Sequence, residues 1–239
     1  MKRLKKLTAA VLLQVLMMQI PVFAQTQEPI KLRSGVKAET NTTIDLKDYN
    51  LTEAQWQQLE KEYKTVTNDR PVMLAMELLK DTVGKYSREA ILGKNLTNRP
   101  IRVQFKDLAQ INPNFQDFDA AGTRVSSKLY ININMKHKDA PPIALAALLS
   151  HEALHQDAYN SINEETYAWT MEAAVYTQLS EKYPEKVDKT HPLITREETL
   201  KRMFIKGNYT DKYIRKSIMA NPAYQNLPMR SPGFEDNNL

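Results

Sequence analysis

The alternation of apolar and polar positions predicts a mixed chain in which helices outnumber strands. Thr52 and Gln55 form a capping box, so a helix is expected from there to about Thr65. Pro71 suits the first turn of a second helix over residues 72–86, whose apolar positions recur at helical spacing. We therefore expect two helices before the first strand.

Two alternating segments predict strands. Residues 101–105 (Ile-Arg-Val-Gln-Phe) and 129–134 (Leu-Tyr-Ile-Asn-Ile-Asn) carry an apolar side chain at every second position, which is the period of a half-buried strand. The residues between the two strands are rich in turn formers. In the second strand Tyr130, Asn132 and Asn134 share one face, and we expect that polar face to point outward.

Helices dominate the second half of the sequence. Pro141 and Pro142 open a helix whose first turns are apolar on every side, which is typical of a buried helix. Ser161 and Glu164 form another capping box and predict a helix that ends near Tyr183. Two more helices are expected, one capped by Thr195 and closed by Gly207 and one over 212–220, before an irregular tail at 221–239.

The N-terminal residues have the pattern of an export signal. The basic residues at its start are Lys2, Arg3, Lys5 and Lys6. An apolar run over 7–20 follows, and residues 22–24 (Val-Phe-Ala) offer small side chains for cleavage. The run is shorter than the roughly 20 residues of a membrane span. We expect residues 1–24 to be a signal peptide or, alternatively, an uncleaved anchor, and 25–43 to be a flexible lead-in.

Charge and cysteine content narrow the function classes. Of the formal net charge of +5, four positive charges lie in the predicted signal, so the exported part carries about +1. That balance gives no reason to expect nucleic acid as a partner. The absence of cysteine excludes a disulfide framework, a thiolate nucleophile and cysteine-bound zinc. Residues 44–220 are numerous enough to form one domain with its own core.

The segment His151-Glu152-Ala-Leu-His155 has the spacing of a metal site. Side chains four residues apart on a helix lie on the same face, with Cβ atoms about 5–6 Å apart, so both imidazoles can reach one ion. Glu152 lies beside them, where its carboxylate can reach a water on that ion. Catalytic zinc needs three protein ligands and an open position. One further ligand is therefore required.

The following helix offers that third ligand. A histidine six residues beyond His155 would define one class of zinc enzyme, but position 161 is Ser161, which excludes that class. Glu164 and Glu165 are the candidates. We prefer Glu165, because Glu164 occupies the capping-box position and because small Ala168 follows Glu165 on the same face. The predicted zinc ligands are His151, His155 and Glu165, with Glu164 as the alternative to Glu165.

The motif and the Glu-x-x-Ala helix resemble the gluzincin group of zinc metallopeptidases, including small bacterial members. The resemblance covers about residues 129–176. It implies an α+β, mostly helical fold with a minimal zincin-like core, in which a small antiparallel sheet and a glutamate-bearing helix pack on the motif helix. The gap from His155 to Glu165 is shorter than in thermolysin-like members. Trp169 stands where many relatives carry Asp or Asn, which leaves open what orients the histidines.

The resemblance implies an exported zinc-dependent metallopeptidase, periplasmic or secreted, that hydrolyses peptide or cell-envelope protein with Glu152 as general base. It also implies that the strand at 129–134 pairs with extended substrate, which makes Tyr130, Asn132 and Asn134 candidate substrate-binding residues.

The remaining polar residues receive less specific predictions. His191 is our candidate donor to the oxyanion, followed by Tyr209 and Tyr213, whereas His137 is expected to be solvated. The alternative function is a non-catalytic exported binding or regulatory module on a degenerate zincin fold. A chance occurrence of the motif is the third possibility.

Overall fold

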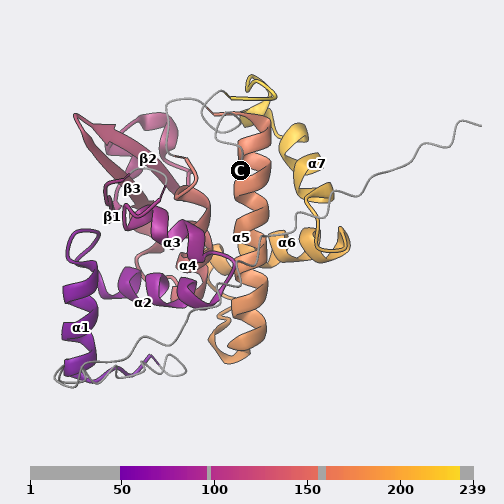
Figure 1. Cartoon of the computed structure of the whole chain (residues 1–239). Coiled ribbons are helices and arrows are strands. Elements are labelled where there is room, and N and C mark those ends of the chain that lie inside the picture. The colour runs from indigo at the N-terminus through magenta and orange to yellow at the C-terminus, as the bar shows by residue number, and fades with distance from the viewer. Residues whose placement is uncertain (1–48, 96–97, 156–159, 232–239) are drawn as a thin grey trace, which may run out of the picture. The chain divides into compact units, whose positions relative to one another are not determined.

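Helix α4 (Pro142–Glu152), which carries the motif, packs against α2 (Arg70–Leu78) and the long helix α5 (Ile162–Lys182). The structure, a computed structural model, describes residues 49–95, 98–155 and 160–231. In Figure 1, α1 to α4 and the sheet lie on one side of α5 and α7 lies on the other, while α6 crosses behind α5 and also contacts α4. The predicted signal at 1–24 and lead-in at 25–43 fall outside the described residues.

Within the described ranges the fold is α+β and mostly helical, as predicted. None of the helices found there has the length and apolar character to cross a membrane. The remaining helices are α1 (Glu53–Tyr63), α3 (Lys85–Ile91), α6 (Pro192–Lys206) and α7 (Lys212–Ala220), and the strands are β1 (Ile101–Lys106), β2 (Ala120–Val125) and β3 (Lys128–Asn134).

The three strands form a mixed sheet in the order β1-β3-β2. The prediction of an antiparallel sheet was therefore wrong for one pair, because β1 runs parallel to β3 and only β2 runs antiparallel to it. The chain leaves β1 through two short 3₁₀ turns, which let it reach the far side of the sheet before β2 begins. Strand β2 itself was not predicted, because its residues Ala120–Val125 overlap the turn-rich stretch.

The central position of β3 overturns the prediction of an outward polar face. Asn132 and Asn134 are buried, with 1% and 7% of their surfaces exposed. The Asn132 side chain accepts a hydrogen bond from Gln104 and donates to Thr123 Oγ1, each at 2.8 Å. Asn134 donates to backbone carbonyls in the loop before β2. These two amides join strands and loops, and β3 has no edge left for a substrate strand.

The predicted second helix is interrupted. Helix α2 gives way to a 3₁₀ turn at Leu79–Asp81, and α3 begins only after Gly84. Thr82 is extended at this break, where its Oγ1 donates to the Leu79 carbonyl and accepts from the Gly84 N–H. A Cβ on Gly84 would lie 2.5 Å from Leu79 Cδ2 and 2.8 Å from Val175 Cγ2, so glycine permits close packing against α5.

The capping residues predicted for the other helices are present, with one exception. The Thr52 capping box is present in full, and Ser161 caps α5. Helix α6, however, begins at Pro192 rather than after Thr195, because proline suits the first turn and His191 supplies the cap. The predicted capping box at Thr195 is therefore wrong.

The C-terminal segment 221–231 is irregular, as predicted, apart from one 3₁₀ turn at Pro222–Tyr224. It was wrong to place this segment outside the domain. The N–H groups of Ile162 and Asn163 donate to the carbonyls of Pro228 and Met229, at 2.9 and 3.1 Å. The segment is therefore bound to the start of α5.

Replacing Asn132 by alanine should lower the free energy of unfolding by about 1–3 kcal/mol, because Gln104 and Thr123 lose a buried partner. Urea unfolding measures this change. Lys128→Ala at the exposed start of β3 is the control, with an expected change within about 0.5 kcal/mol. Unchanged stability of Asn132→Ala would contradict the structural role of the amide.

Candidate metal centre

The motif lies at the end of its helix rather than within it. Helix α4 ends at Glu152, and the turn then tightens. The N–H groups of Leu154 and His155 bond to carbonyls three residues back, those of His151 and Glu152, at 3.0 and 3.3 Å. A turn with this shorter hydrogen bond is of the 3₁₀ type. It still places the second imidazole beside the first.

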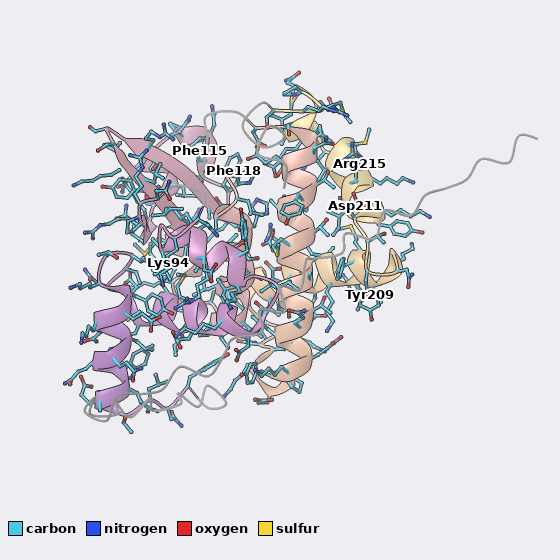
Figure 2. The ribbon with its side chains drawn as sticks, viewed as in Figure 1. Lys94, Phe115, Phe118, Tyr209, Asp211 and Arg215 are labelled. Atoms are coloured by element: carbon cyan, nitrogen blue, oxygen red, sulfur yellow. The ribbon has the colours of Figure 1, made fainter. Side chains whose placement is uncertain are left out.

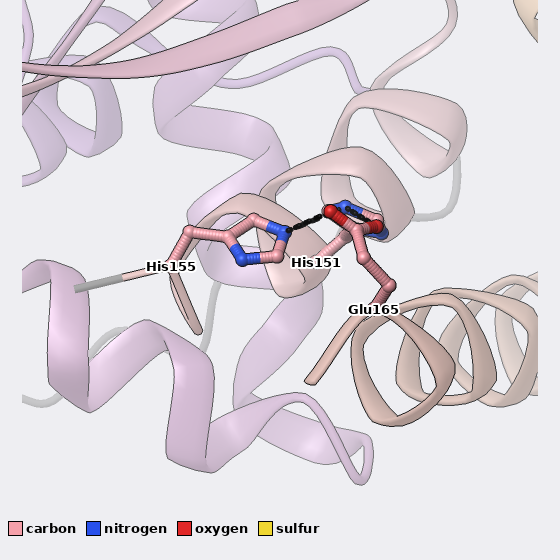
Figure 3. A group of neighbouring side chains, drawn as sticks. All are labelled: His151, His155 and Glu165. Carbon is pink, nitrogen blue, oxygen red and sulfur yellow. Dashed lines mark hydrogen bonds and ion pairs between the residues drawn. The ribbon is translucent and has the colours of Figure 1, made fainter. Parts of the chain in front are cut away.

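Three side chains converge on one point between α4 and α5. The Nε2 atoms of His151 and His155 are 3.0 Å apart, and oxygens of Glu165 lie 3.9 and 3.7 Å from them. Figure 3 shows both rings directed toward the carboxylate. A tetrahedral ion with ligand bonds of about 2.0–2.1 Å holds its ligand atoms about 3.3 Å apart. The three residues therefore have the spacing to hold one metal ion.

The protonation of the two rings supports a cation at that point. Each ring turns its Nδ1 to a carboxylate: His155 to Glu164 at 2.8 Å and His151 to Glu172 at 3.0 Å. Because an ionised carboxylate only accepts, the hydrogen bond to Glu164 places the hydrogen on Nδ1 of His155, and its Nε2 then faces His151 and Glu165. The two Nε2 atoms lie 3.0 Å apart, close enough to share a proton or to bind one metal ion together.

Glu165 is the better of the two candidate ligands. Its Oε2 is buried and has no hydrogen-bond partner within the described part of the chain, which is the state expected of an atom that awaits an ion. Glu164 is committed elsewhere, because its carboxylate accepts from His155 and from Ser231. The geometry therefore favours Glu165 over Glu164 as the third ligand. Asn160 donates to the other oxygen of Glu165 and helps to hold it.

Glu172 takes the position beside His151 that Trp169 cannot fill as an acidic group. It lies seven residues beyond Glu165, two turns along the same face of α5, and is fully buried. Its carboxylate holds Nδ1 of His151, while Trp169 lies beside that ring with centroids 6.4 Å apart. Glu172 was not predicted, although its spacing of seven residues from Glu165 places both carboxylates on the same face of α5.

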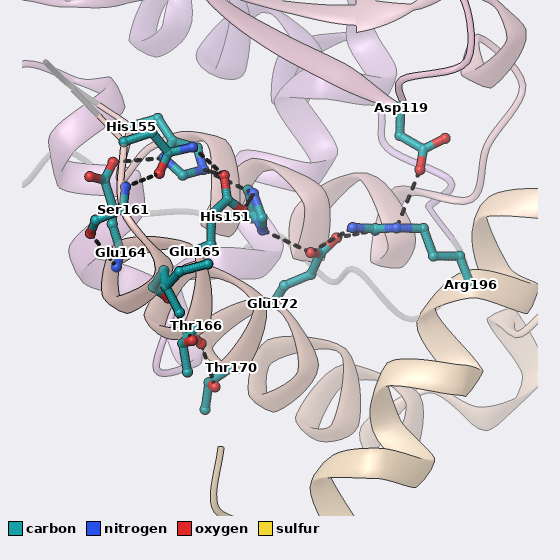
Figure 4. A network of polar contacts seen from close by, with 12 residues as sticks. Asp119, His151, His155, Ser161, Glu164, Glu165, Thr166, Thr170, Glu172 and Arg196 are labelled. Atoms are coloured by element: carbon teal, nitrogen blue, oxygen red, sulfur yellow. Dashed lines mark hydrogen bonds and ion pairs between the residues drawn. The ribbon is translucent and has the colours of Figure 1, made fainter. Parts of the chain in front are cut away.

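Arg196 of α6 connects this carboxylate to the sheet. Its guanidinium binds both oxygens of Glu172, and its Nε lies 3.2 Å from Asp119 Oδ2. Asp119 in turn bonds to His137 Nε2 at 2.6 Å. Figure 4 shows the line of contacts from His151 through Glu172 and Arg196 to Asp119. The prediction that His137 is solvated was wrong: 1% of its surface is exposed.

This network fixes the charge of its members. Burial raises the pKa of Glu172, but Arg196 and His151 outweigh burial and hold that pKa well below its usual range. The pKa of Asp119 is also lowered, since its bond to His137 and the charge of Arg196 exceed the effect of burial. Both carboxylates are therefore anions, and the guanidinium of Arg196 lies between them as their shared cation.

Glu152 lies beside the two histidines at the wall of a cavity. Its side chain is buried against the two histidines and lines a cavity of about 820 Å³ that also borders His151, His155 and Glu165. Burial raises the pKa of Glu152, and the charges of Glu165 and Glu172 add to the rise, whereas both histidines oppose it. The carboxylate is thus placed in a cavity with an increased affinity for a proton.

The cavity wall includes predicted and unpredicted residues. Tyr130 lines it, as do Arg196 and Tyr224. Burial raises the pKa of Tyr224 first, and the charge of Glu165 raises it further, so the hydroxyl remains a donor at neutral pH. Tyr224 is the best candidate for a donor to developing negative charge, and the tail prediction gave no sign of it.

The sequence-based donor candidates lie elsewhere. Among the residues that the structure describes, the cavity lining does not include His191, Tyr209 or Tyr213. His191 caps α6, where Nδ1 accepts from the Leu193 N–H at 3.1 Å. Figure 2 shows Tyr209 beside α6 and α7, across α5 from Phe115. We therefore correct the assignment of His191 as oxyanion donor.

Metal binding should release a proton from His155. Burial lowers the pKa of His155, but the bond to Glu164 and the charges of Glu165 and Glu152 outweigh it and raise the pKa from 6.5 to about 9. Since a metal requires the neutral ring, affinity for Zn²⁺ should rise with pH up to about 9. Calorimetry at pH 7.5 in two buffers of different ionisation enthalpy should detect release of about one proton. Affinity that does not vary between pH 6.5 and 9 would contradict this coupling.

Replacing Glu172 by glutamine should weaken Zn²⁺ binding about 10- to 100-fold, because His151 loses the charge that orients it. Competition with a chromophoric chelator measures the affinity. Glu181→Gln, at an exposed position on the same helix, should leave it unchanged. Equal affinities for wild type and Glu172→Gln would rule out the orienting role.

Comparisons with known proteins leave the site to be judged on its own geometry. Neither the family models, nor the curated proteins, nor the solved structures gave a match to this chain. Three converging ligand atoms and the carboxylates behind them are the features that support a metal centre.

Proposed function

We propose that this protein is an exported zinc-dependent metallopeptidase. The observation that carries the proposal is the arrangement around one cavity. His151, His155 and Glu165 present ligand atoms to a common point, and the acidic side chain of Glu152 opens into the same cavity. Two histidines and one carboxylate, with room left for water, are a donor set of catalytic zinc.

Glu152 is the general base in this proposal. A zinc ion, when bound, supplies a Lewis acid that polarises a peptide carbonyl and makes water nucleophilic near neutral pH. The Glu152 carboxylate accepts the proton of the attacking water and then delivers it to the leaving amine. Its raised pKa suits this role, because a base works best when its pKa lies near the operating pH.

The surrounding residues keep the histidines oriented and their charge balanced. Glu164 and Glu172 hold the Nδ1 atoms, so both rings keep Nε2 turned to the ligand point. Arg196 binds Glu172 and Asp119 at once, which prevents Glu172 from turning away from His151. Such orienting groups govern metal affinity nearly as strongly as the ligands do.

Strand β2 is the edge on which an extended peptide would pair. The Asn134 N–H donates to the Asp119 carbonyl, so by alternation the backbone groups of Ala120 and Gly122 point away from β3. Both residues line the cavity. The outer edge of β1 is occupied where the Val103 N–H donates to the Val66 carbonyl. Peptide addition at β2 therefore replaces the pairing with β3 expected from sequence.

The cavity favours peptide over small polar substrates. The stacked rings of Phe115 and Phe118, 5.0 Å apart, border it on one side, and Trp169 and Tyr224 border it on another. The export signal read from the sequence directs the protein to the periplasm or the medium. Peptides and cell-envelope proteins are the substrates we propose.

Replacing Glu152 by glutamine should lower peptide hydrolysis about 100- to 10,000-fold while zinc stays bound, since the base is lost and the ligands remain. A fluorogenic peptide library and elemental analysis measure the two properties. His155→Ala should lose both. A wild type that holds stoichiometric zinc, but whose every activity survives Glu152→Gln, would favour the non-catalytic binding module instead.

A further inference from the structure

The carboxylate of Glu164 joins two distant parts of the chain. Its Oε1 accepts from His155 Nδ1 at 2.8 Å, and its Oε2 accepts from the Ser231 hydroxyl at 3.1 Å. Both Glu164 and Ser231 are buried, with 2% and 1% of their surfaces exposed. The hydroxyl is thus a buried donor to the carboxylate that orients a predicted metal ligand.

The backbone on either side of this contact is fixed as well. The first N–H groups of a helix have no partner within the helix. In α5 the first two, of Ile162 and Asn163, donate to the Pro228 and Met229 carbonyls, and the third, of Glu164, donates to Ser161 Oγ. The C-terminal segment therefore caps the turn that carries both Glu164 and Glu165.

The same segment reaches the other histidine through aromatic rings. Tyr224 packs edge-on against Trp169 with centroids 6.0 Å apart, and Trp169 lies beside His151. Tyr224 and Leu227 also line the cavity. One stretch of eleven residues, 221–231, thus touches the supports of both histidines.

A cap alone would not require the hydroxyl of Ser231. The carbonyls of Pro228 and Met229 satisfy the helix end without it. Without the hydroxyl, Glu164 Oε2 would lose its described donor, and the carboxylate could rotate about its last bond. Rotation would move the oxygen that holds His155. The hydroxyl therefore acts on the orientation of the ring.

We infer that segment 221–231 is an integral part of the metal centre and that Ser231 is a positioning residue, acting through Glu164 on His155. The inference rests on the proposed metal site. It assigns to the C-terminal segment a role in holding the ion as well as in closing the fold.

Replacing Ser231 by alanine should weaken Zn²⁺ binding about 3- to 10-fold, at or below the lower end of the effect of residues that contact a ligand directly. Chelator competition on the full chain measures the affinity. The absorption spectrum of the Co²⁺-loaded protein should shift, because the geometry at His155 changes. Ser231→Thr keeps the hydroxyl and should restore both properties.

Ser180→Ala is the matched control. Ser180 is also buried, and its hydroxyl bonds to the Thr177 carbonyl near the opposite end of α5. Its loss should lower the thermal unfolding temperature without changing Zn²⁺ affinity or the Co²⁺ spectrum. Ser231→Ala should add no further weakening to Glu164→Gln, since both changes interrupt one line of contacts.

The outcomes separate the two proposals. Wild type without stoichiometric zinc would overturn the metal site, and this inference with it. Tight zinc in wild type and equal affinity in Ser231→Ala would overturn the inference alone. Additive losses in the double variant would show that Ser231 acts independently of Glu164, which also overturns it.

Discussion

The contact between α4 and α5 is the constraint on which the rest of the site depends. Helix α4 is buried on all sides, and only 6% of the surface of His151 at its end is exposed, so the ring makes its polar contacts with protein groups. An unpaired buried polar group costs about 1–3 kcal/mol, and a charged one more. The partners must come from α5, whose N-terminal half places Glu164, Glu165 and Glu172 against the two rings.

This solution concentrates negative charge. Glu152, Glu164, Glu165 and Glu172 surround two histidines, and Arg196 is shared between Glu172, Asp119 and Glu197. Burial raises the pKa of Glu197 well above its ordinary value, and the charge of Glu172 adds to this rise. Burial lowers the pKa of His155, but the surrounding carboxylates outweigh burial and raise this pKa to about 9. In the proposed metal site, a divalent ion would take the place of the proton on His155.

The sheet and the C-terminal segment shape the cavity around this cluster. Because β3 lies between β1 and β2, its asparagine side chains bond to the neighbouring strands and loops. The open edge of the sheet beside the cavity therefore belongs to β2. Residues 221–231 close another side and bind the start of α5. Elements from across the domain therefore contribute to one small site.

The buried motif helix and the capped helix after it could be predicted from the sequence, as could the position of Glu165 on that helix, because these features depend on spacing within one or two turns. The residues that contact the histidines and their carboxylates from distant segments could be identified only in the tertiary structure. Glu172, Arg196 and Ser231 take their roles from helix packing and from the course of the tail, which local periodicity does not encode. The central position of β3 could not be predicted for the same reason. Strand order depends on how the connections cross the sheet, and the alternation in residues 129–134 is equally compatible with an edge strand.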